Sequence, residues 1–269
     1  MNPTELYTFY TNTYLERDIQ TIFQELDFHD TIRLEKRDSN CQFSSNVDWL
    51  AKDDSNLCVM AWQKMVDVFG LGGVSIELEK RIPAGGGLGG GSSNAATILK
   101  GLRKLYELDV SDYELETIGI DLGADVPFFI KGKTQIGDGI GEILKPIKTV
   151  INGCYLLVAP DLHIDTKWAY GEFKNILDRP NEIVNFLGFI RKEIIPFELF
   201  ENDFEAIVVP AYPEIGQIKN SLRVHGARFA SLSGSGSTVF GVFDEDADAK
   251  SAESHFSSRY NTFITNPTL

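Results

Sequence analysis

The stretch Pro83-Ala-Gly-Gly-Gly-Leu-Gly-Gly-Gly-Ser-Ser-Asn-Ala-Ala96 decides how this chain is interpreted. It carries six glycines in the seven positions from Gly85 to Gly91. Glycine lets the main chain adopt positive φ and approach a ligand without a Cβ in the way. An ordered loop of this composition loses more conformational entropy than any other, so a bound partner has to offset that loss. A flexible hinge is the alternative, and we favour a ligand-binding loop.

A strand and a helix flank this loop. Residues 74–79 (VSIELE) alternate as in a strand, and residues 93–105 (SNAATILKGLRKL) have apolar positions at helical spacing. A helix start offers unpaired N–H groups and the positive end of the helix dipole, so the loop and helix together predict an anion site. Ser92 and Ser93 supply hydroxyls suited to a phosphate oxygen or to Mg²⁺. The loop is neither a Walker A motif nor the dinucleotide fingerprint, because Gly-Lys-Ser/Thr and the later acidic residue are both missing.

The overall charge restricts the partners. The 269 residues carry a formal net charge of -14, with 43% hydrophobic and 24% charged residues, as in an ordinary folded protein. A field of this sign repels nucleic acid and anionic lipid, so we expect neither as a partner. It also repels nucleotides at long range. A phosphate site in this chain must therefore rely on local donors and a metal cation.

The three cysteines, Cys41, Cys58 and Cys154, form neither a CxxC motif nor a Cys/His cluster, and an odd number suits no disulfide framework. We interpret them as small buried hydrophobes and expect no protein metal site. The first residues (MNPTELYTFY) resemble neither a signal peptide nor a transit peptide, and no apolar run reaches membrane-spanning length. We expect a cytoplasmic protein.

The remaining first half mixes strands and helices. Residues 31–34 (TIRL) read as a strand and residues 56–69 (NLCVMAWQKMVDVF) as a helix. Ser111 and Glu114 form a capping box that starts a third helix, expected to stop at Gly123.

The second half begins with an apolar run, residues 154–159 (CYLLVA), that predicts a buried strand. From about Asp203 the pattern predicts helix, helix, strand (227–232), glycine turn, strand (238–243), helix and strand. This order is typical of an α+β layer with helices on one face of an antiparallel sheet. We expect the domain boundary near residues 149–153.

At the glycine loop the sequence resembles the GHMP kinases, whose hallmark is Pro-x3-Gly-Leu-Gly-Ser-Ser-Ala-Ala. Further segments agree with the family in order, so the likeness covers nearly all the chain from about Gln20: residues 20–31 (QTIFQELDFHDT), 122–129 (LGADVPFF), 139–147 (GIGEILKPI), 202–215 (NDFEAIVVPAYPEI) and 233–240 (SGSGSTVF). The resemblance implies a two-domain α+β GHMP kinase fold. Residues 1–150 would form the ATP-binding half, similar to ribosomal S5 domain 2, and residues 151–269 a ferredoxin-like half.

The implied activity is ATP- and Mg²⁺-dependent phosphorylation of a small alcohol. The loop variant GLGGGSSNAA is most similar to family members that phosphorylate the 2-hydroxyl of a cytidine diphosphate-linked polyol in non-mevalonate isoprenoid biosynthesis. The alternatives are another GHMP kinase, of homoserine or mevalonate type, and a nucleotide-binding pseudokinase without turnover. We expect a monomer or homodimer.

The family pattern assigns roles to individual residues. Asp125 matches the catalytic aspartate, and we expect it at a helix C-terminus, where it can accept or orient the alcohol proton. Thr166 and Tyr170 fall where the family holds the cytidine, although a Tyr at this spacing is often core. The turn at residues 233–236 matches an element packed near the phosphate loop, or reads simply as a hairpin turn. The ATP-binding positions are Asn56 (also a candidate helix N-cap), Lys80, Pro83, Gly85, Gly86, Gly87, Leu88, Gly89, Gly90, Gly91, Ser92 and Ser93.

The N-terminus departs from the family. The family opens with a strand reading Pro-Ala-Lys-Ile-Asn-Leu, whose lysine supports the catalytic aspartate, followed by Asp-Gly-Tyr-His. Here residues 13–18 (TYLERD) stand where the second motif is expected, and the lysine is missing. A truncated or misassigned start, a rearranged N-terminus and a loss of activity all remain open explanations, and Asn12, Tyr14 or Arg17 could partly substitute.

Overall fold

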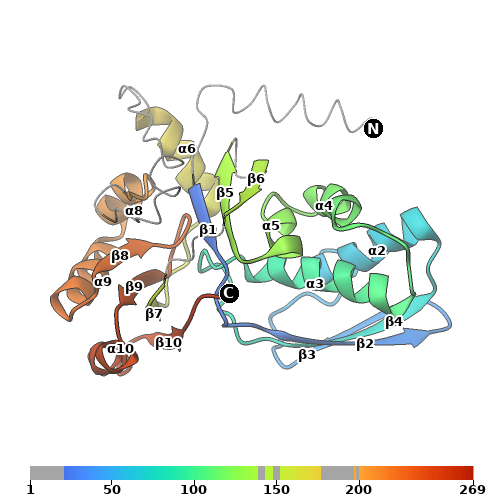
Figure 1. Ribbon diagram of the computed structural model, residues 1–269, viewed down its shortest axis with the longest axis horizontal. Helices are drawn as coiled ribbons and strands as arrows, with labels where there is room; N and C mark the ends of the chain where they lie inside the picture. Colours follow the sequence, from blue (N-terminus) through green and yellow to red (C-terminus); the bar gives the residue numbers. More distant parts are fainter. Residues whose placement is uncertain (1–20, 139–142, 148–151, 177–196, 198–199, 269) are drawn as a thin grey trace. The chain divides into compact units, whose positions relative to one another are not determined.

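A computed structural model describes residues 21–138, 143–147, 152–176, 197 and 200–268 (Figure 1). The expectations for residues 12–18, and part of the family-like segment 139–147, lie outside the described residues. The described residues form two compact units. The first holds residues 21–25, 31–80, 91–138 and 143–147, and the second holds 26–30, 81–90 and everything described from 152 onward. The glycine loop thus packs with the second unit, and a family-domain boundary near residue 150 stays a prediction.

The first unit contains two three-stranded sheets. The larger has the order β2 (Thr31–Arg37), β4 (Gly73–Glu79), β3 (Cys41–Ser45), with β2 antiparallel and β3 parallel to β4. The smaller is antiparallel, with the order β1 (Thr21–Gln24), β5 (Thr134–Asp138), β6 (Ile143–Pro146). Along β4 the apolar residues Ile76 and Leu78 are buried and Glu77 is exposed, so one face of the larger sheet is core and the other is solvated.

Helices α2 (Leu57–Phe69) and α3 (Gly90–Leu105) lie on the core side of the larger sheet, and α4 (Asp112–Ile120) and α5 (Val126–Lys131) lie beyond α3 and complete the core (Figure 1). The predicted helices 56–69 and 93–105 are confirmed. Helix α3, however, begins three residues earlier than expected, at Gly90. Glycine has low helix propensity, so the early start reflects packing: a Cβ on Gly91 would lie 3.2 Å from Leu57 Cδ1 at the start of α2.

The capping box at Ser111 and Glu114 is confirmed, with both reciprocal hydrogen bonds present. The expected end at Gly123 is wrong, since α4 ends at Ile120. The Leu122 N–H donates to the Gly119 carbonyl, three residues back, at 2.9 Å, and this tighter bonding closes the last turn early.

The second unit is an antiparallel sheet with the order β10-β7-β9-β8: β10 (Asn261–Thr265), β7 (Cys154–Ala159), β9 (Val239–Phe243) and β8 (Phe229–Leu232). All six residues of β7 are buried, as predicted. The core on one face of the sheet includes residues from α8 (Glu205–Ala211), α9 (Pro213–Val224) and α10 (Asp246–Glu253). Helix α6 (Thr166–Ile176) precedes them in the chain. The predicted element order from residue 203 is confirmed, although β8 and β9 each start slightly later, at Phe229 and Val239.

The other face of this sheet carries an aromatic cluster around Tyr155, Leu157, Phe229 and Val242. Leu88, the single non-glycine residue between Gly85 and Gly91, packs against this cluster. Cys58 and Cys154 are buried, one in the core of each unit, as predicted for small hydrophobes, whereas Cys41 on β3 is only partly buried against the first core. None of the helices in the described part of the chain combines the length and apolar composition that crossing a membrane requires.

Candidate active site

The glycine loop has an alternating backbone. Gly85, Gly87 and Gly89 have φ of +66°, +72° and +64°, whereas Gly86 and Leu88 do not take positive φ. Residues with side chains rarely adopt these positive angles, which explains the glycines at alternate positions. Alternation of right- and left-handed conformations turns successive N–H groups toward the same side and makes an anion-binding concavity. Beyond Gly89 the chain passes directly into α3.

The base of the loop is fixed by a carboxylate that our sequence reasoning missed. Asp30 Oδ1 accepts hydrogen bonds from the main-chain N–H groups of Arg81, at 2.6 Å, and Ile82, at 2.8 Å. Charged acceptors make the stronger class of hydrogen bond. Together with Leu88, which packs in the aromatic cluster, this contact anchors the loop on both sides of its exposed glycines.

A second glycine turn, residues 233–238, packs directly on the loop. Ser233 Oγ donates to the Gly87 carbonyl at 2.8 Å, and the Thr238 N–H donates to the Gly86 carbonyl at 3.1 Å. A Cβ on Gly87 would lie 2.1 Å from the Ser233 carbonyl oxygen, and one on Gly86 would lie 2.7 Å from Thr238 Oγ1. The expected packing of this turn against the glycine loop is therefore confirmed, and it excludes side chains at both glycines.

The same turn also makes hydrogen bonds to the start of α6, where the predicted cytidine site lies. Thr166 Oγ1 is 3.2 Å from Ser235 Oγ, and Ser237 Oγ donates to the Leu162 carbonyl at 2.7 Å. Asp165 Oδ1 accepts from the Trp168 N–H at 2.6 Å and so holds the first turn of the helix.

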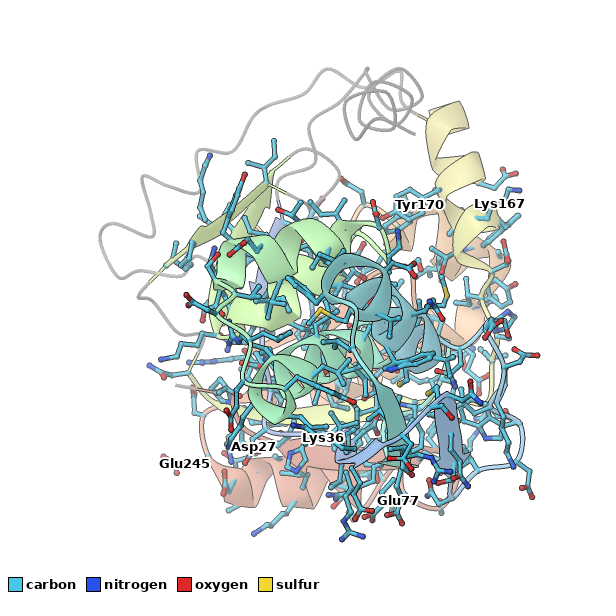
Figure 2. All side chains as sticks on the ribbon, turned by 90° about the vertical axis from the view of Figure 1, so that its right-hand side faces the viewer. Asp27, Lys36, Glu77, Lys167, Tyr170 and Glu245 are labelled. Carbon is cyan, nitrogen blue, oxygen red and sulfur yellow. The ribbon has the colours of Figure 1, made fainter. Side chains whose placement is uncertain are left out.

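Tyr170 lies one turn further along α6, and Figure 2 labels it with Lys167 on that helix. It is half-buried, and its ring makes an edge-to-face contact with Phe204, with centroids 4.8 Å apart. This contact fixes the ring in one orientation, as either a core residue or a stacking platform requires. The substrate-binding roles of Thr166 and Tyr170 stay predictions.

His163 is a further residue that our sequence reasoning missed. It is exposed, and its Nδ1 lies 3.2 Å from the position that a Cβ on Gly85 would occupy. An imidazole can donate a hydrogen bond to an anion from either ring nitrogen, depending on its protonation. No local spacing pattern pointed to it, because the contact is made 78 residues away in the chain from Gly85.

In the first unit, two segments meet the first turn of α3. A Cβ on Gly123 would lie 3.8 Å from Ser92 Oγ, so the turn before Asp125 lies beside the predicted phosphate-binding hydroxyls. The start of α2 lies on Gly91, as described above. Asn56 caps α2: its Oδ1 accepts from the Cys58 N–H at 2.8 Å, and its Nδ2 donates to the Ala51 carbonyl at 2.6 Å.

The N-cap interpretation of Asn56 is thus confirmed, and its role toward a nucleotide stays a prediction. The main chain of Lys80 is bound on both sides by the side chain of Asn46, which accepts from its N–H at 2.7 Å and donates to its carbonyl at 3.1 Å. Lys80 is thereby held at the end of β4, and its contact with nucleotide likewise stays a prediction.

Asp125 does not lie at a helix C-terminus as we expected. It occupies the N-cap position of α5, with Pro127 in the first turn, because α4 ends at Ile120 and a short turn separates the two helices. Its side chain makes no capping hydrogen bond. The residue remains accessible to solvent, but the surrounding protein partly desolvates the carboxylate and raises its pKa. A carboxyl with a raised pKa that is not engaged in capping is a candidate general base.

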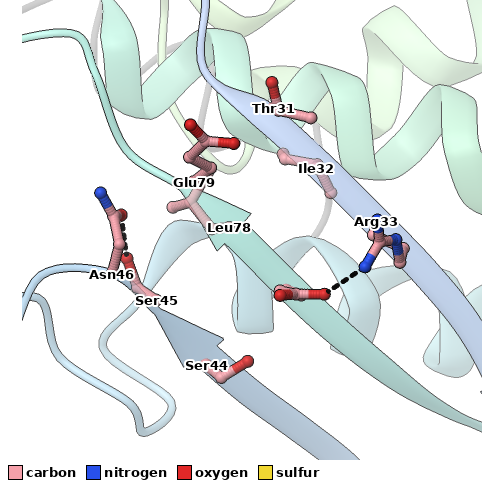
Figure 3. Close-up of a pocket in the computed structure, with 9 residues that line it drawn as sticks. Thr31, Ile32, Arg33, Ser44, Ser45, Asn46, Leu78 and Glu79 are labelled. Atoms are coloured by element: carbon pink, nitrogen blue, oxygen red, sulfur yellow. Dashed lines mark hydrogen bonds and ion pairs between the residues drawn. The ribbon is translucent and has the colours of Figure 1, made fainter.

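Among the described residues, no group of three or more His, Cys, Asp or Glu side chains could hold a metal ion. A hollow of about 610 Å³ lies on the solvated face of the β2–β4–β3 sheet, where Arg33 Nη1 pairs with Glu77 Oε2 at 3.0 Å (Figure 3). None of the predicted site residues lines this hollow.

Comparison with known families and proteins gives consistent matches. The model of the GHMP kinases N terminal domain matches residues 56–133, and that of the GHMP kinases C terminal matches residues 193–262. The 4-diphosphocytidyl-2-C-methyl-D-erythritol kinase of Chlorobaculum tepidum is 37% identical over 254 residues, covering 92% of this chain and 88% of that protein. The protein of the same name from Chlorobium chlorochromatii is 40% identical over 256 residues, with the same coverage.

Solved structures agree. The crystal structure of a 4-(cytidine 5'-diphospho)-2C-methyl-D-erythritol kinase superposes with a TM-score of 0.80 at 28% identity, covering 94% of this chain and 91% of that one. A homoserine kinase from Cytophaga hutchinsonii superposes with a TM-score of 0.72 at 18% identity, covering 95% and 96% of the two chains, which shows a shared fold.

Proposed function

Because this chain belongs to the GHMP kinase family and has its two-domain α+β fold, we propose that it transfers the γ-phosphoryl group of ATP to the 2-hydroxyl of 4-diphosphocytidyl-2-C-methyl-D-erythritol. The relatives that carry this name, at 35–40% identity over most of the chain, support this acceptor over homoserine or mevalonate. The proposal places the enzyme in the cytoplasm, where ATP is available. The observation that carries it is the alternating glycine backbone that leads into α3.

The loop fits a polyphosphate. Positive φ at alternate glycines is the backbone pattern that can turn successive main-chain amides toward one anion, and Gly85 and Gly87 are exposed. Hydrogen bonds to charged acceptors contribute about 1.5–3 kcal/mol each, so a few amides can offset the repulsion from a protein of net charge -14. In this proposal the amides of residues 85–91 bind the phosphates, with the dipole of α3 adding to the attraction.

Ser92 and Ser93 are the residues that fit Mg²⁺ or a phosphate oxygen, since both are half-buried hydroxyls in the first turn of α3. Bound Mg²⁺ neutralises charge that develops on the β- and γ-phosphates. Mg²⁺ in such sites commonly takes one or two oxygens from the protein and the rest from phosphates and water, so the phosphates would supply a large share of its ligands here.

Asp125 acts in this scheme as the general base. The substrate oxygen forms a bond to the γ-phosphorus, the bond from phosphorus to the β–γ bridging oxygen breaks, ADP leaves, and Asp125 takes the hydroxyl proton. Desolvation raises the pKa of the Asp125 carboxyl, and a carboxylate with a raised pKa is a stronger base toward the hydroxyl proton. Thr166 and Tyr170 would hold the cytidine end.

A coupled assay of ADP release tests the proposal. Asp125→Asn is expected to lower kcat by about 10²–10⁴, the usual contribution of a positioned base, with MgATP affinity unchanged. Asp121→Asn is the matched control, because it removes a carboxylate from the same turn, one that pairs with Lys64 at 2.7 Å, and should leave kcat within about twofold.

The acceptor panel separates the alternatives. Turnover with mevalonate or homoserine, and none with the cytidylyl substrate, would point to another GHMP kinase. MgATP binding without turnover of any alcohol, equal in wild type and Asp125→Asn, would identify a pseudokinase and overturn the proposed reaction.

A further inference from the structure

The turn that supports the phosphate loop is itself held by one side chain. Asn202 Nδ2 donates to two main-chain carbonyls, those of Leu232 and Gly234, both at 2.8 Å. These carbonyls flank Ser233 on either side, and Ser233 Oγ donates to the Gly87 carbonyl at 2.8 Å. Asn202 therefore holds the main chain on both sides of Ser233, the residue whose hydroxyl contacts the centre of the glycine loop.

The position of Asn202 follows from the sheet order. Strand β8 lies at the end of the order β10-β7-β9-β8, so one side of it has no neighbouring strand among the described residues. There the side chains of residues 202–205 take the place of a strand. Glu205 Oε1 accepts from the Leu232 N–H at 2.9 Å, while Asn202 binds the Leu232 carbonyl. Both polar main-chain groups of Leu232 are thus satisfied at an edge that would otherwise be open.

Asn202 is also fixed in orientation. Its Oδ1 accepts from the Phe204 N–H at 3.0 Å, so both ends of the amide are engaged and the Nδ2 hydrogens point at the turn. Glu205 is held by Lys219 on α9 and by Ser231 Oγ at 3.0 Å. The clamp formed by Asn202 and Glu205 is therefore anchored in the helical layer of the second unit.

We propose that Asn202 is a positioning residue for nucleotide binding, acting through the 233–238 turn to hold the phosphate loop in its anion-binding conformation. The turn acts on the loop through close packing as well as through hydrogen bonds. The Ser233 carbonyl oxygen lies so close to Gly87 that no Cβ fits between them, so a displaced turn changes the room available to the loop. This inference rests on the proposed use of the loop for ATP phosphates.

Two substitutions separate this role from a local one at the start of α8. Asn202→Asp keeps the acceptor for the Phe204 N–H, loses both donors and places a negative charge beside two carbonyl oxygens. Asn202→Ala loses all three interactions. If Asn202 served only the local turn, the Asp variant would match wild type. Our inference instead has both variants weaken MgATP binding, by about tenfold for the loss of two modest hydrogen bonds to the turn.

The control variant loses a side-chain hydrogen bond elsewhere in the second unit. Thr262→Val removes the hydrogen bond from Thr262 Oγ1 to Glu253 Oε1, at 2.9 Å, without touching the turn. It should lower stability slightly and leave MgATP affinity unchanged. Ser233→Ala is a second test variant, because it removes the bond to Gly87 and leaves Asn202 in place.

The experiment combines calorimetric titration with MgATP, steady-state kinetics and amide hydrogen exchange of the unliganded protein. Expected results for Asn202→Asp are a tenfold rise in Kd and in KM for ATP, a KM for the alcohol within twofold, and faster exchange of amides in residues 83–91. Wild-type affinity with wild-type exchange in the Asp variant would overturn the inference, as would an equal loss of affinity in Thr262→Val. A wild-type protein that binds no MgATP would refute the proposed function instead, and hydrogen exchange would still decide whether Asn202 orders the loop.

Discussion

The glycine loop and the turn that ends at Asp125 contribute to the proposed reaction in opposite ways. The loop works through its main chain: Gly85, Gly87 and Gly89 have positive φ, Gly87 also packs closely against Ser233, and no side chain between Gly85 and Gly91 offers a polar group. The turn works through one side chain, whose carboxyl has a raised pKa. Because of this difference, adding a side chain to a loop glycine should impair nucleotide binding, whereas replacing one carboxylate oxygen of Asp125 should impair turnover.

Gly87→Ala should have the largest effect of the variants considered, because it should disrupt nucleotide binding by the loop. The new Cβ would lie 2.1 Å from the Ser233 carbonyl oxygen, a main-chain atom that cannot move alone, and φ at this position is +72°. We expect MgATP affinity to fall at least about 100-fold, equivalent to losing roughly 2.8 kcal/mol of phosphate contacts, as measured by calorimetry.

Gly70→Ala is the matched control for that variant. Gly70 ends α2 with φ of +64°, and a Cβ there would meet nothing within 4 Å. This variant carries the same backbone strain without the clash, so it should lose about 1–2 kcal/mol of stability and keep its MgATP affinity. Equal loss of affinity in the two variants would show that strain alone, and no close packing, explains the glycine at position 87.

The fall in reaction rate at low pH, the acid limb of the rate profile, tests the proposed role of Asp125 in the turn. A base must be ionised, so turnover should fall about tenfold per pH unit below the pKa of Asp125. Desolvation raises that pKa, so the limb should lie above the ordinary aspartate value of about 3.9. Measuring kcat/KM against pH, which reports the pKa of the free enzyme, in wild type and Asp121→Asn, checks where the limb lies. A midpoint at or below the ordinary value would contradict the role of burial.

The smallest expected effect is a gain in stability. A carboxyl whose pKa is higher in the folded than in the unfolded state opposes folding once ionised, and this penalty disappears as pH falls through the folded pKa. Asp125→Asn should therefore raise Tm at pH 7, by no more than about 2–4 °C because the group stays partly solvated, and the gain should vanish in acid. Thermal unfolding at several pH values measures it. A lower Tm at pH 7 would show that the carboxylate makes a stabilising contact.

Local patterns predicted the elements to which they were applied, but the strands β1, β3, β5 and β6 were not predicted. The apolar spacing at residues 56–69 and the Ser111–Glu114 capping box depend on neighbours within a few positions, and both are present. The glycine loop was recognisable because its composition is costly without a ligand. Errors arose where packing overrides propensity: α3 includes Gly90 and Gly91, and α4 stops before Gly123.

What the sequence could not supply are partners far apart in the chain. Asp30 binds N–H groups 51 and 52 positions away, Asn202 binds carbonyls 30 and 32 positions away, and Ser233 meets Gly87 across 146 positions. No spacing rule relates such residues, and all of them lie in or near segments that stood out only through family resemblance. The position of Asp125 was likewise misjudged: it was expected at a helix C-terminus and is the N-cap of α5, because α4 ends at Ile120.

The central claim is that main-chain amides of the glycine loop bind the phosphates of a nucleotide. Calorimetric titration of the wild-type protein with MgATP and, separately, with adenosine tests it directly, since the two ligands differ only in the phosphates and metal. The account predicts that MgATP binds at least about 100-fold more tightly, as two or more charged hydrogen bonds require. Equal affinity for the two ligands, or no detectable heat with millimolar MgATP, would contradict it.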